Sequence, residues 1–202
     1  MAFAMSPFPN PSFDGPLPAG AHAHEPFLVA RLRDGDTTAF AELVRHYMNS
    51  AMRFATHLLG SRDAAEDIVQ SVFIHVWERR STLDPARSFK SYVFRAVRNS
   101  ALNDRKAAAV RQRYQTAVQD ELASGTTQGS VASPERRVLD TATVQAALQR
   151  LSDRRRIALR LRLIDELSHA EIADVLGISA TAAQSLVVRA IADLREILRD
   201  GA

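Results

Sequence analysis

Apolar residues recur every three to four positions through most of this 202-residue chain. That spacing places them on one face of an α-helix and predicts a series of amphipathic helices. The predicted helices span residues 25–33, 37–59, 63–80, 88–122, 134–150, 153–164 and two stretches within 168–198. No stretch shows the sustained alternation or the hairpin turn signals of paired strands. The pattern therefore predicts an all-α protein.

The last two predicted helices have clear boundary signals. Ser168 followed by Glu171 forms a capping box, which satisfies the first backbone N–H groups of a helix. Gly177 suits the left-handed conformation that ends that helix, and Ser179 is the expected N-cap of the next. Two helices joined by so tight a turn are typical of a DNA-binding helix-turn-helix, although a helical hairpin in a bundle has the same pattern.

Two stretches lack any helical pattern. Residues 1–24 contain five prolines, and residues 123–133 are rich in Ser, Gly and Thr. We expect a disordered leader in the first stretch and a flexible linker in the second. The helices then form two small domains, at residues 25–122 and 134–202, with the linker between them.

The helix at residues 63–80 has one apolar and one mostly polar face. Phe73 and Trp77 fall at helical spacing among the other apolar residues, which predicts that they pack in the core. The opposite face carries Asp63, Glu66, Asp67, Gln70 and Ile74. An apolar side chain among carboxylates suggests a surface for a protein partner, although single exposed apolar residues are common.

Charge is unevenly distributed along the chain, although the formal net charge is only +3. Between residues 87 and 113 there are eight basic residues and one acidic residue, Asp104. A solvated helix face usually balances its cations with Glu or Asp four residues away. The excess of cations here is typical of a surface that binds nucleic-acid phosphates.

A further helix is predicted at residues 153–164, with Ser152 as its N-cap. We expect Ile157, Leu161 and Ile164 to point inward. Its outer side is expected to carry Arg154, Arg155, Arg156, Arg160 and Arg162.

Composition restricts the chemistry that the chain can perform. There is no Cys, so disulfides and thiolate metal sites are excluded. No apolar run reaches the ~18–20 residues of a membrane span, and no secretory signal is visible, so we expect a cytoplasmic protein without membrane insertion. The His residues are scattered, and no set of nucleophile, base and orienting group can be named. We therefore expect no catalytic site, no metal site and no cofactor.

Three segments resemble, in order, parts of the sigma-seventy superfamily, and the short chain resembles its extracytoplasmic-function (group four) sigma factors. The family's core-polymerase-binding helix is similar to DAAEDIVQSVFIHVWER. Its promoter −10 helix is similar to SFKSYVFRAVRNSALNDRK. Its second domain, up to the −35-reading helix, is similar to LQRLSDRRRIALRLRLIDELSHAEIADVLGIS. The resemblance covers about residues 27–198.

The resemblance implies a subunit that binds core RNA polymerase and directs transcription initiation at promoter DNA, and not an enzyme. The residues implied in core binding are Asp63, Glu66, Asp67, Gln70 and Ile74. Those implied in −10 binding are Lys90, Arg95, Arg98, Asn99, Arg105 and Lys106. Those implied in −35 binding are Ser179, Thr181, Ala182, Gln184, Ser185 and Arg189. The loop at residues 81–88 lies where the family captures a flipped base. An anti-sigma factor commonly holds the family inactive, so we expect such a partner here.

The chain departs from the family at the expected −35 helix. Many members carry Lys, Arg and His where this chain has Gln184, Leu186 and Val188. Phosphate contacts should therefore be fewer, unless the arginines of the helix at residues 153–164 supply them. Two alternatives stay open. One is a helix-turn-helix repressor or activator, and the other is a sigma-like adaptor that does not read promoters.

Overall fold

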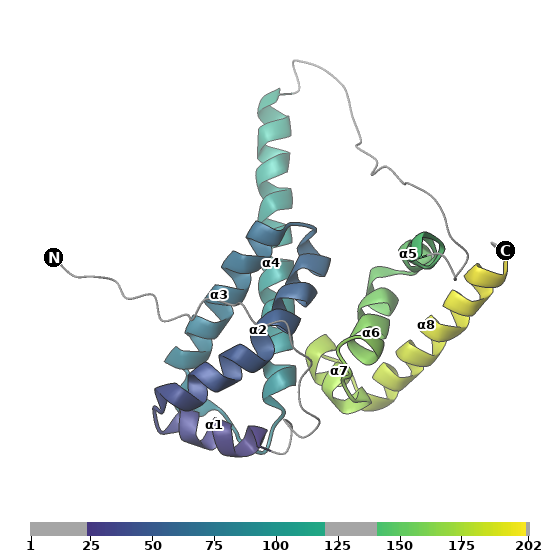
Figure 1. The fold of residues 1–202 in the computed structure, drawn as a ribbon. Coiled ribbons are helices and arrows are strands. Elements are labelled where there is room, and N and C mark those ends of the chain that lie inside the picture. The colour runs from purple at the N-terminus through teal and green to yellow at the C-terminus, as the bar shows by residue number, and fades with distance from the viewer. Residues whose placement is uncertain (1–23, 120–140, 201–202) are drawn as a thin grey trace. The chain divides into compact units, whose positions relative to one another are not determined.

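The computed structural model describes residues 24–119 and 141–200, with side chains at 24–107 and 143–200. These ranges contain helices and no strand, which confirms the expected all-α class (Figure 1). The chain divides into two units, with the boundary in the sequence between Ala107 and Ala108, and each unit is described separately. Residues 1–23 of the expected leader, the expected linker and the start of the helix predicted at 134–150 lie outside the described residues.

The first unit is built from four α-helices and a short 3₁₀ helix, and the second from four α-helices. The first contains α1 (Glu25–Arg33), α2 (Thr37–Leu59), α3 (Arg62–Glu78), η2 (Arg80–Thr82) and the beginning of α4 (Phe89–Gln119). The second contains α5 (Thr141–Arg150), α6 (Asp153–Leu163), α7 (His169–Leu176) and α8 (Ala180–Asp200). Helix α3 ends two residues earlier than predicted, because the chain tightens into η2.

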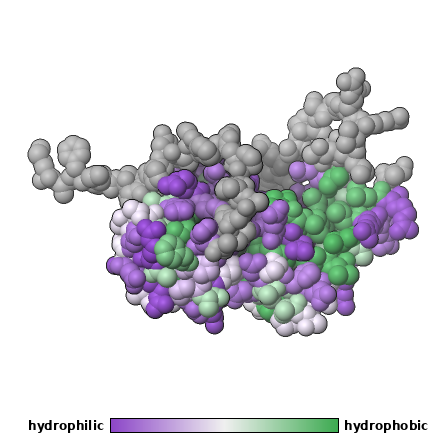
Figure 2. Space-filling model, turned by 60° about the horizontal axis from the view of Figure 1, so that its bottom comes forward, coloured by the Kyte–Doolittle hydropathy of each residue, from purple (hydrophilic) through white to green (hydrophobic). Residues whose placement is uncertain are grey.

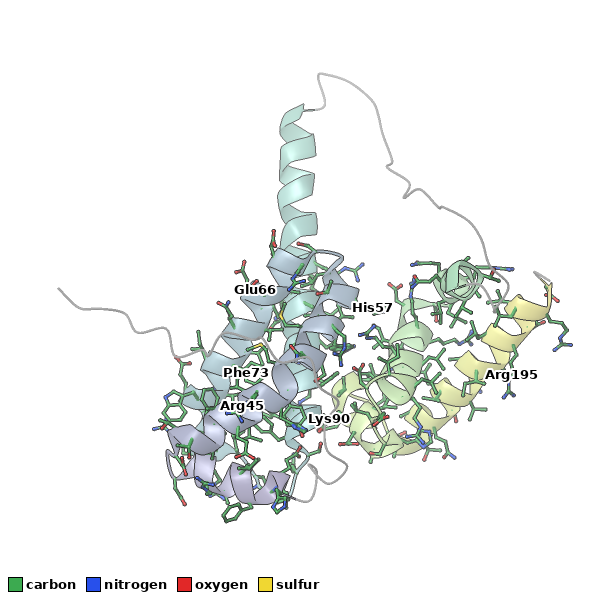
Figure 3. The ribbon with its side chains drawn as sticks, in the orientation of Figure 1. Arg45, His57, Glu66, Phe73, Lys90 and Arg195 are labelled. Carbon is green, nitrogen blue, oxygen red and sulfur yellow. The ribbon has the colours of Figure 1, made fainter. Side chains whose placement is uncertain are left out.

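Aromatic side chains fill the core of the first unit. Phe54, Phe73 and Phe94 are fully buried, and the rings of Phe54 on α2 and Phe94 on α4 lie 5.0 Å apart between centroids (Figure 3). The predicted core position of Phe73 is thus confirmed. Trp77 is half-buried and packs against Phe40, with their ring centroids 5.2 Å apart. These contacts bury aromatic surface from α2, α3 and α4 together.

A buried carboxylate links three helices of this unit. Glu25, the first residue of α1, is 8 % exposed. One of its oxygens accepts a hydrogen bond of 2.7 Å from the backbone N–H of Phe89, the first residue of α4. The other accepts a hydrogen bond from the hydroxyl of Tyr47 on α2. A negative charge at a helix N-terminus is stabilised by the free N–H groups and the macrodipole, so Glu25 both caps α4 and fixes α1 against it.

The second unit has an aliphatic core. Leu161, Leu167 and Ile172 are fully buried, and Leu151, Leu159 and Ala190 form a further buried cluster. Part of the unit's apolar surface stays outside the core. In the view of Figure 2, hydrophobic side chains cover a broad area of this unit.

One residue predicted to be inward in the second unit is exposed. Ile164 is 57 % exposed, next to Leu163 at 61 %. Helix α6 ends at Leu163, so the helical period no longer decides which way the following side chain points. The chain turns there, and Leu167 takes the inward place that was predicted for Ile164.

Four of the five α6 arginines that were predicted on its outer side make contacts within the unit. Arg155 pairs with Asp193 of α8 at 2.5 Å, and Arg160 pairs with Asp165 at 3.5 Å. Arg156 contacts Gln149 at 2.6 Å and pairs with Asp153. Arg162 donates to the carbonyl of Leu167 at 3.1 Å, and only Arg154 keeps the expected exposed position without such a contact in the described ranges. The predicted outer position is thus confirmed for Arg154 and Arg162, which are exposed, whereas Arg155, Arg156 and Arg160 are half-buried. The contact of Arg155 was not predictable from local sequence, because Asp193 is 38 residues away. Ser152 is the N-cap residue of α6 as predicted, but its side chain makes no capping hydrogen bond.

Taken singly, no helix in the described ranges is long and apolar enough to cross a bilayer. Helices α7 and α8 together reach that length and composition, but a bend of 101° separates them.

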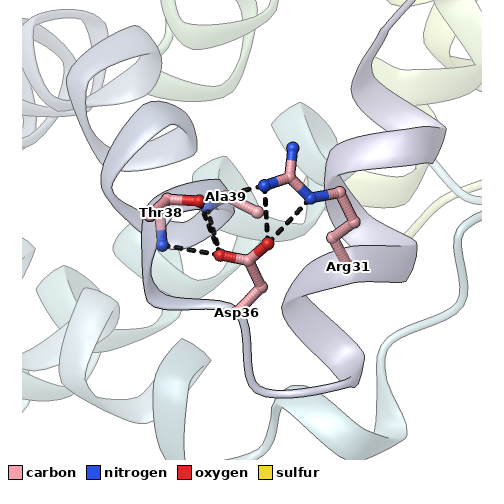
Figure 4. Close-up of polar contacts among 4 residues, drawn as sticks. All are labelled: Arg31, Asp36, Thr38 and Ala39. Carbon is pink, nitrogen blue, oxygen red and sulfur yellow. Dashed lines mark hydrogen bonds and ion pairs between the residues drawn. The ribbon is translucent and has the colours of Figure 1, made fainter.

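Asp36 is the centre of a polar cluster at the start of α2 (Figure 4). Its carboxylate accepts hydrogen bonds from the Thr38 hydroxyl at 2.6 Å, the Thr38 N–H at 2.8 Å and the Ala39 N–H at 3.2 Å. The Arg31 guanidinium of α1 donates to it at 2.8 Å. The Thr38 hydroxyl bond, followed by the Ala39 and Arg31 bonds, holds the pKa of Asp36 well below its usual value. The cluster therefore caps α2 and joins it to α1 while the carboxyl group is ionised.

Removal of the Glu25 carboxylate is expected to destabilise the first unit strongly. The Glu25→Ala change leaves the Phe89 N–H and the Tyr47 hydroxyl without their acceptor inside the core, at a cost of about 3 kcal/mol. Tyr47→Phe removes one of the two bonds and should cost about 1 kcal/mol. Urea unfolding followed by fluorescence of the single Trp, Trp77, measures this unit. Glu42→Ala, at an exposed position of α2, is the control and should change stability by less than about 0.5 kcal/mol. Equal stability of Glu25→Ala and the control would contradict the proposed role.

The stability of the first unit is expected to fall in acid partly through Asp36. Its pKa is lower in the folded than in the unfolded chain, so the carboxylate stabilises the fold above pH ~4. This contribution is lost as the pH falls below that value and the carboxyl group is protonated. Asp36→Asn keeps an N-cap side chain but cannot titrate, so its unfolding midpoint should depend less on pH between about 4 and 2. Thr38→Val removes the largest cause of the shift and should give an intermediate slope. A slope identical to the wild type in both variants would rule out Asp36 as the titrating group.

Candidate polymerase and nucleic-acid interfaces

One exposed face of α3 is acidic. Its residues are Asp63, Glu66, Asp67, Gln70 and Ile74, all of them exposed. Their spacing of 3, 4, 7 and 11 positions puts them along a single stripe of the helix. Ile74 is 47 % exposed, and Gln70 donates to Glu66 at 3.2 Å (Figure 3). Within the described ranges no ion pair neutralises Asp63, Glu66 or Asp67. The stripe is therefore an acidic surface with one apolar side chain, Ile74, at its C-terminal end.

A basic stripe runs along α4. Its members, at spacings of 3, 4, 7, 10 and 11 positions, are Arg95, Arg98, Asn99, Leu102, Arg105 and Lys106. Asn99, Arg105 and Lys106 are exposed, whereas Arg95 and Arg98 are half-buried. The Arg95 guanidinium lies 5.9 Å from the centroid of the Tyr92 ring, which steadies its position. An amide among cations on one helical face gives a surface that can hold phosphates and reach a base edge.

Lys90 does not share this stripe, although it was expected in the same site. It is only 9 % exposed (Figure 3). Lys90 precedes Phe94, Val97 and Ala101 by 4, 7 and 11 positions, so it lies on the buried face of α4. Counting along the helix from the sequence would have revealed this. Lys90 is therefore not available as a phosphate contact in this structure.

The loop at residues 81–88 joins η2 to α4. Ser81, Thr82 and Asp84 are exposed. The Thr82 hydroxyl donates to the Arg79 carbonyl at 2.8 Å, and the Asp84 carboxylate accepts from the Ala86 N–H at 3.0 Å. Side chains that hold their own backbone in this way order a short loop. Within the described ranges, no three His, Asp or Glu side chains are grouped to hold a metal ion.

Helices α7 and α8 form the predicted helix-turn-helix. The Ser168 hydroxyl accepts from the Glu171 N–H at 3.2 Å, and the Glu171 carboxylate accepts from the Ser168 N–H at 2.8 Å. Gly177 ends α7 with φ at 65°, a left-handed conformation that glycine adopts without steric strain. The Ser179 hydroxyl then accepts from the Ala182 N–H at 3.2 Å and caps α8. The three boundary signals read from the sequence are therefore confirmed.

The two faces of α8 differ sharply at its N-terminal half. Ala183, Val187 and Ala190 are buried against the unit. Six exposed residues lie toward solvent: Ser179, Thr181, Ala182, Gln184, Ser185 and Arg189. Val188, at 59 % exposure, shares the stripe of Thr181, Gln184 and Ser185. The outer face is thus uncharged for almost three turns, with an exposed Val at its end.

The turn before α7 contains a strained residue. Glu166 is the one described non-glycine residue with positive φ, at 56°. L-residues pay a steric cost there that glycine avoids. The strain is held by its neighbours, because Asp165 and Leu167 are both buried.

Comparison with known proteins gives two family matches that coincide with these surfaces. Sigma-70 region 2 matches residues 43–111, which include the acidic stripe of α3 and the basic stripe of α4. Sigma-70 region 4 matches residues 141–194, which include the helix-turn-helix. The sigma factor NccH of Alcaligenes xylosoxydans xylosoxydans is 32 % identical over 175 residues, with 85 % of this chain and 93 % of NccH covered. The chain belongs to the extracytoplasmic-function sigma factors.

Two further relatives agree with this membership. The extracytoplasmic-function sigma factor SigW of Bacillus subtilis is 28 % identical over 183 residues, which cover 85 % of this chain and 95 % of SigW. A solved structure of CnrH, in complex with the cytosolic domain of CnrY, has a TM-score of 0.61 and 25 % identity, with 88 % of this chain and 99 % of CnrH covered.

As a sigma factor, the chain directs promoter-specific transcription initiation with RNA polymerase. This activity accounts for both family regions in their order along the chain. It is favoured over an independent repressor or activator and over an adaptor that does not read promoters.

Replacing Glu166 with glycine is expected to stabilise the second unit of this sigma factor. The Glu166→Gly change relieves the positive-φ strain, and this relief outweighs the higher backbone entropy that glycine gives the unfolded chain, with a net gain of about 1 kcal/mol. Hydrogen exchange of the slowest amides in α7 and α8 reports the stability of this unit. The control is Glu196→Gly at an exposed position inside α8, which should lose about 1 kcal/mol. Faster exchange in Glu166→Gly would show that the Glu side chain, and not the backbone conformation, decides stability at the turn.

Proposed function

We propose that the exposed stripes described above are the working surfaces of this sigma factor. The acidic stripe of α3 binds core RNA polymerase, the outward stripe of α4 contacts the promoter −10 element, and the outer face of α8 reads the −35 element. The domains that carry them span residues 25–122 and 134–202. The observation that carries the proposal is that each stripe is exposed at helical spacing and lies within a sigma-family match.

Charge supports the assignment of α3 to polymerase. Asp63, Glu66 and Asp67 repel the phosphates of DNA, whereas a basic protein surface would attract them. Ile74 adds an apolar contact that DNA phosphates cannot use but a protein side chain can. Complementary charge of this kind sets orientation and association rate more than final affinity.

The composition of the α4 stripe supports contact with promoter DNA. Arg105 and Lys106 are exposed cations suited to phosphates, and Arg95 and Arg98 can extend the same row. Asn99 lies among them and suits an adenine edge. The neighbouring loop at residues 81–88 is proposed to receive a flipped base, with Ser81, Thr82 and Asp84 as candidates for its recognition.

We also propose a regulatory protein partner for this chain. CnrH is bound in its solved structure to the cytosolic domain of CnrY, which supports an anti-sigma factor here as well. The chain itself is proposed to act in the cytoplasm and to have no catalytic activity of its own, because the polymerase performs the chemistry. No cofactor is required for this role.

A pull-down with core polymerase, followed by run-off transcription, tests the proposed surfaces. Asp67→Arg reverses one charge of the acidic stripe and should weaken core binding about five- to tenfold. Glu42→Arg, which reverses an exposed charge on α2 of the same unit, is the matched control and should bind core normally.

Unchanged core affinity of Asp67→Arg would remove α3 from the docking surface. Core binding without initiation would favour the adaptor, and specific DNA binding by the free chain as a dimer would favour a conventional regulator. Wild-type chain and core together should give transcripts that neither gives alone.

A further inference from the structure

The helix-turn-helix of this sigma factor carries almost no positive charge. Residues 168–188 contain no Lys and no Arg, but they contain two acidic residues, Glu171 and Asp174. The first cation of α8 is Arg189, its tenth residue, which lies about 14 Å along the axis from the start of the helix. DNA backbone contacts by cations are therefore scarce where the helix would enter the major groove.

Three arginines of the preceding helix, α6, do not make up for this deficit, because the unit uses them in internal contacts. Arg155 and Arg160 pair with Asp193 and Asp165, and Arg162 donates to the Leu167 carbonyl. Between residues 141 and 200 there are nine arginines and eight acidic residues, so the unit is nearly neutral. Exposed cations suited to DNA phosphates lie outside residues 168–188, at Arg154 of this unit and at Arg105 and Lys106 on α4 of the first unit.

The outer face of α8 carries side chains that can contact the edges of bases. Gln184 is exposed and matches the N6 and N7 positions of adenine with its amide. Val188 is 59 % exposed and four positions further on, one helical turn along the same stripe. An exposed apolar side chain in the major groove matches the C5-methyl group of thymine. Thr181 and Ser185 flank them with hydroxyl groups that accept or donate.

We infer that the second unit reads A·T base pairs in the −35 element by direct contact, with adenine held by Gln184 and a thymine methyl packed on Val188. Phosphate contacts are supplied by the cation stripe of α4 and by exposed arginines outside residues 168–188. This inference rests on the proposed −35 role of α8 and names its preferred base pairs.

A protein partner fits this face less well than DNA. A helix that docks in an apolar groove needs several apolar anchors at i, i+3, i+4 and i+7, but this stripe has one large apolar residue, Val188, beside three hydrogen-bonding side chains. Alternating polar groups with one apolar contact correspond to the pattern that base edges present in the major groove.

Holoenzyme selection on a promoter pool, randomised at both the −10 and −35 windows, identifies the preferred bases. We expect the wild-type holoenzyme to enrich A·T pairs at certain −35 positions. Holoenzymes that carry Gln184→Ala or Val188→Ala should no longer enrich A·T pairs at those positions. On the selected promoter, replacing the contacted thymine with uracil removes only the methyl group. Wild-type holoenzyme should then form open complexes with about fourfold lower affinity, which corresponds to ~0.8 kcal/mol for one methyl group.

Val188→Ala should already show this loss and should not distinguish thymine from uracil. The matched control is Leu163→Ala, which truncates another exposed aliphatic side chain of the same unit, at 61 % exposure, and should keep the discrimination. Adding a cation through Ser185→Lys should steepen the slope of log K against log salt by about 0.9, because it creates a phosphate contact that the wild type lacks.

The outcomes separate the inference from the proposed function. Selection of G·C pairs at these positions, or equal sensitivity to uracil in wild type and Val188→Ala, overturns the inference while transcription from the pool still supports the −35 role. No enrichment in the −35 window, with transcription intact, overturns the −35 role itself. Failure of the holoenzyme to initiate anywhere in the pool overturns the proposed function.

Discussion

The arrangement of the first unit depends on one buried carboxylate. Glu25 is 64 residues away in sequence from Phe89, yet it accepts the N–H of Phe89 at 2.7 Å. Because Phe89 begins α4, this bond fixes where the basic helix starts and how it is rotated relative to α1. A buried charge is costly unless it is hydrogen-bonded, so the Tyr47 hydroxyl and the helix N-terminus must both stay in place. The orientation of the basic stripe of α4, the proposed DNA contact, thus follows from a contact in the core.

In the second unit, ion pairs hold arginine side chains that would otherwise be free to contact DNA. Arg160 pairs with Asp165, whose side chain has no exposed area. A buried pair of this kind is expensive to break, by about 3–5 kcal/mol, since one charge would remain buried alone. The pair of Arg155 with Asp193 is about one third exposed and is worth less, but it still holds the guanidinium against α8. These two arginines are therefore held by contacts within the unit and are not free to assist the proposed DNA contact of the helix-turn-helix.

The local sequence predicted most helix boundaries. It did not predict contacts between residues that are distant in the sequence. Ser168, Gly177 and Ser179 mark helix ends correctly because a cap depends on residues only a few positions away. The same locality explains why the helix-turn-helix and its outward residues were predictable. The partner of Arg155, 38 residues away, and the burial of Glu25 could not be read from any local pattern. Lys90 is a different case, because its helical phase with Phe94 and Val97 was visible in the sequence. The prediction for Lys90 was wrong because it rested on the net charge of the segment and not on the position of Lys90 around the helix.

The uneven distribution of charge has a consequence for how two small domains locate a promoter. Phosphate contacts give affinity without sequence information, whereas base-edge contacts give discrimination with little free energy of their own. If both domains carried strong cation stripes, each would hold non-specific DNA by itself. In the proposed arrangement, residues 168–188 of the second unit carry no Lys or Arg, so its helix-turn-helix contributes less to non-specific binding than the cation stripe of α4. The second unit gains affinity mainly through its covalent connection to the first and through the polymerase that binds the chain, which raise its effective concentration at the neighbouring DNA. Weak binding by the isolated second unit is then a requirement for selectivity, because a −35 reader that bound any phosphate backbone tightly would no longer distinguish promoters.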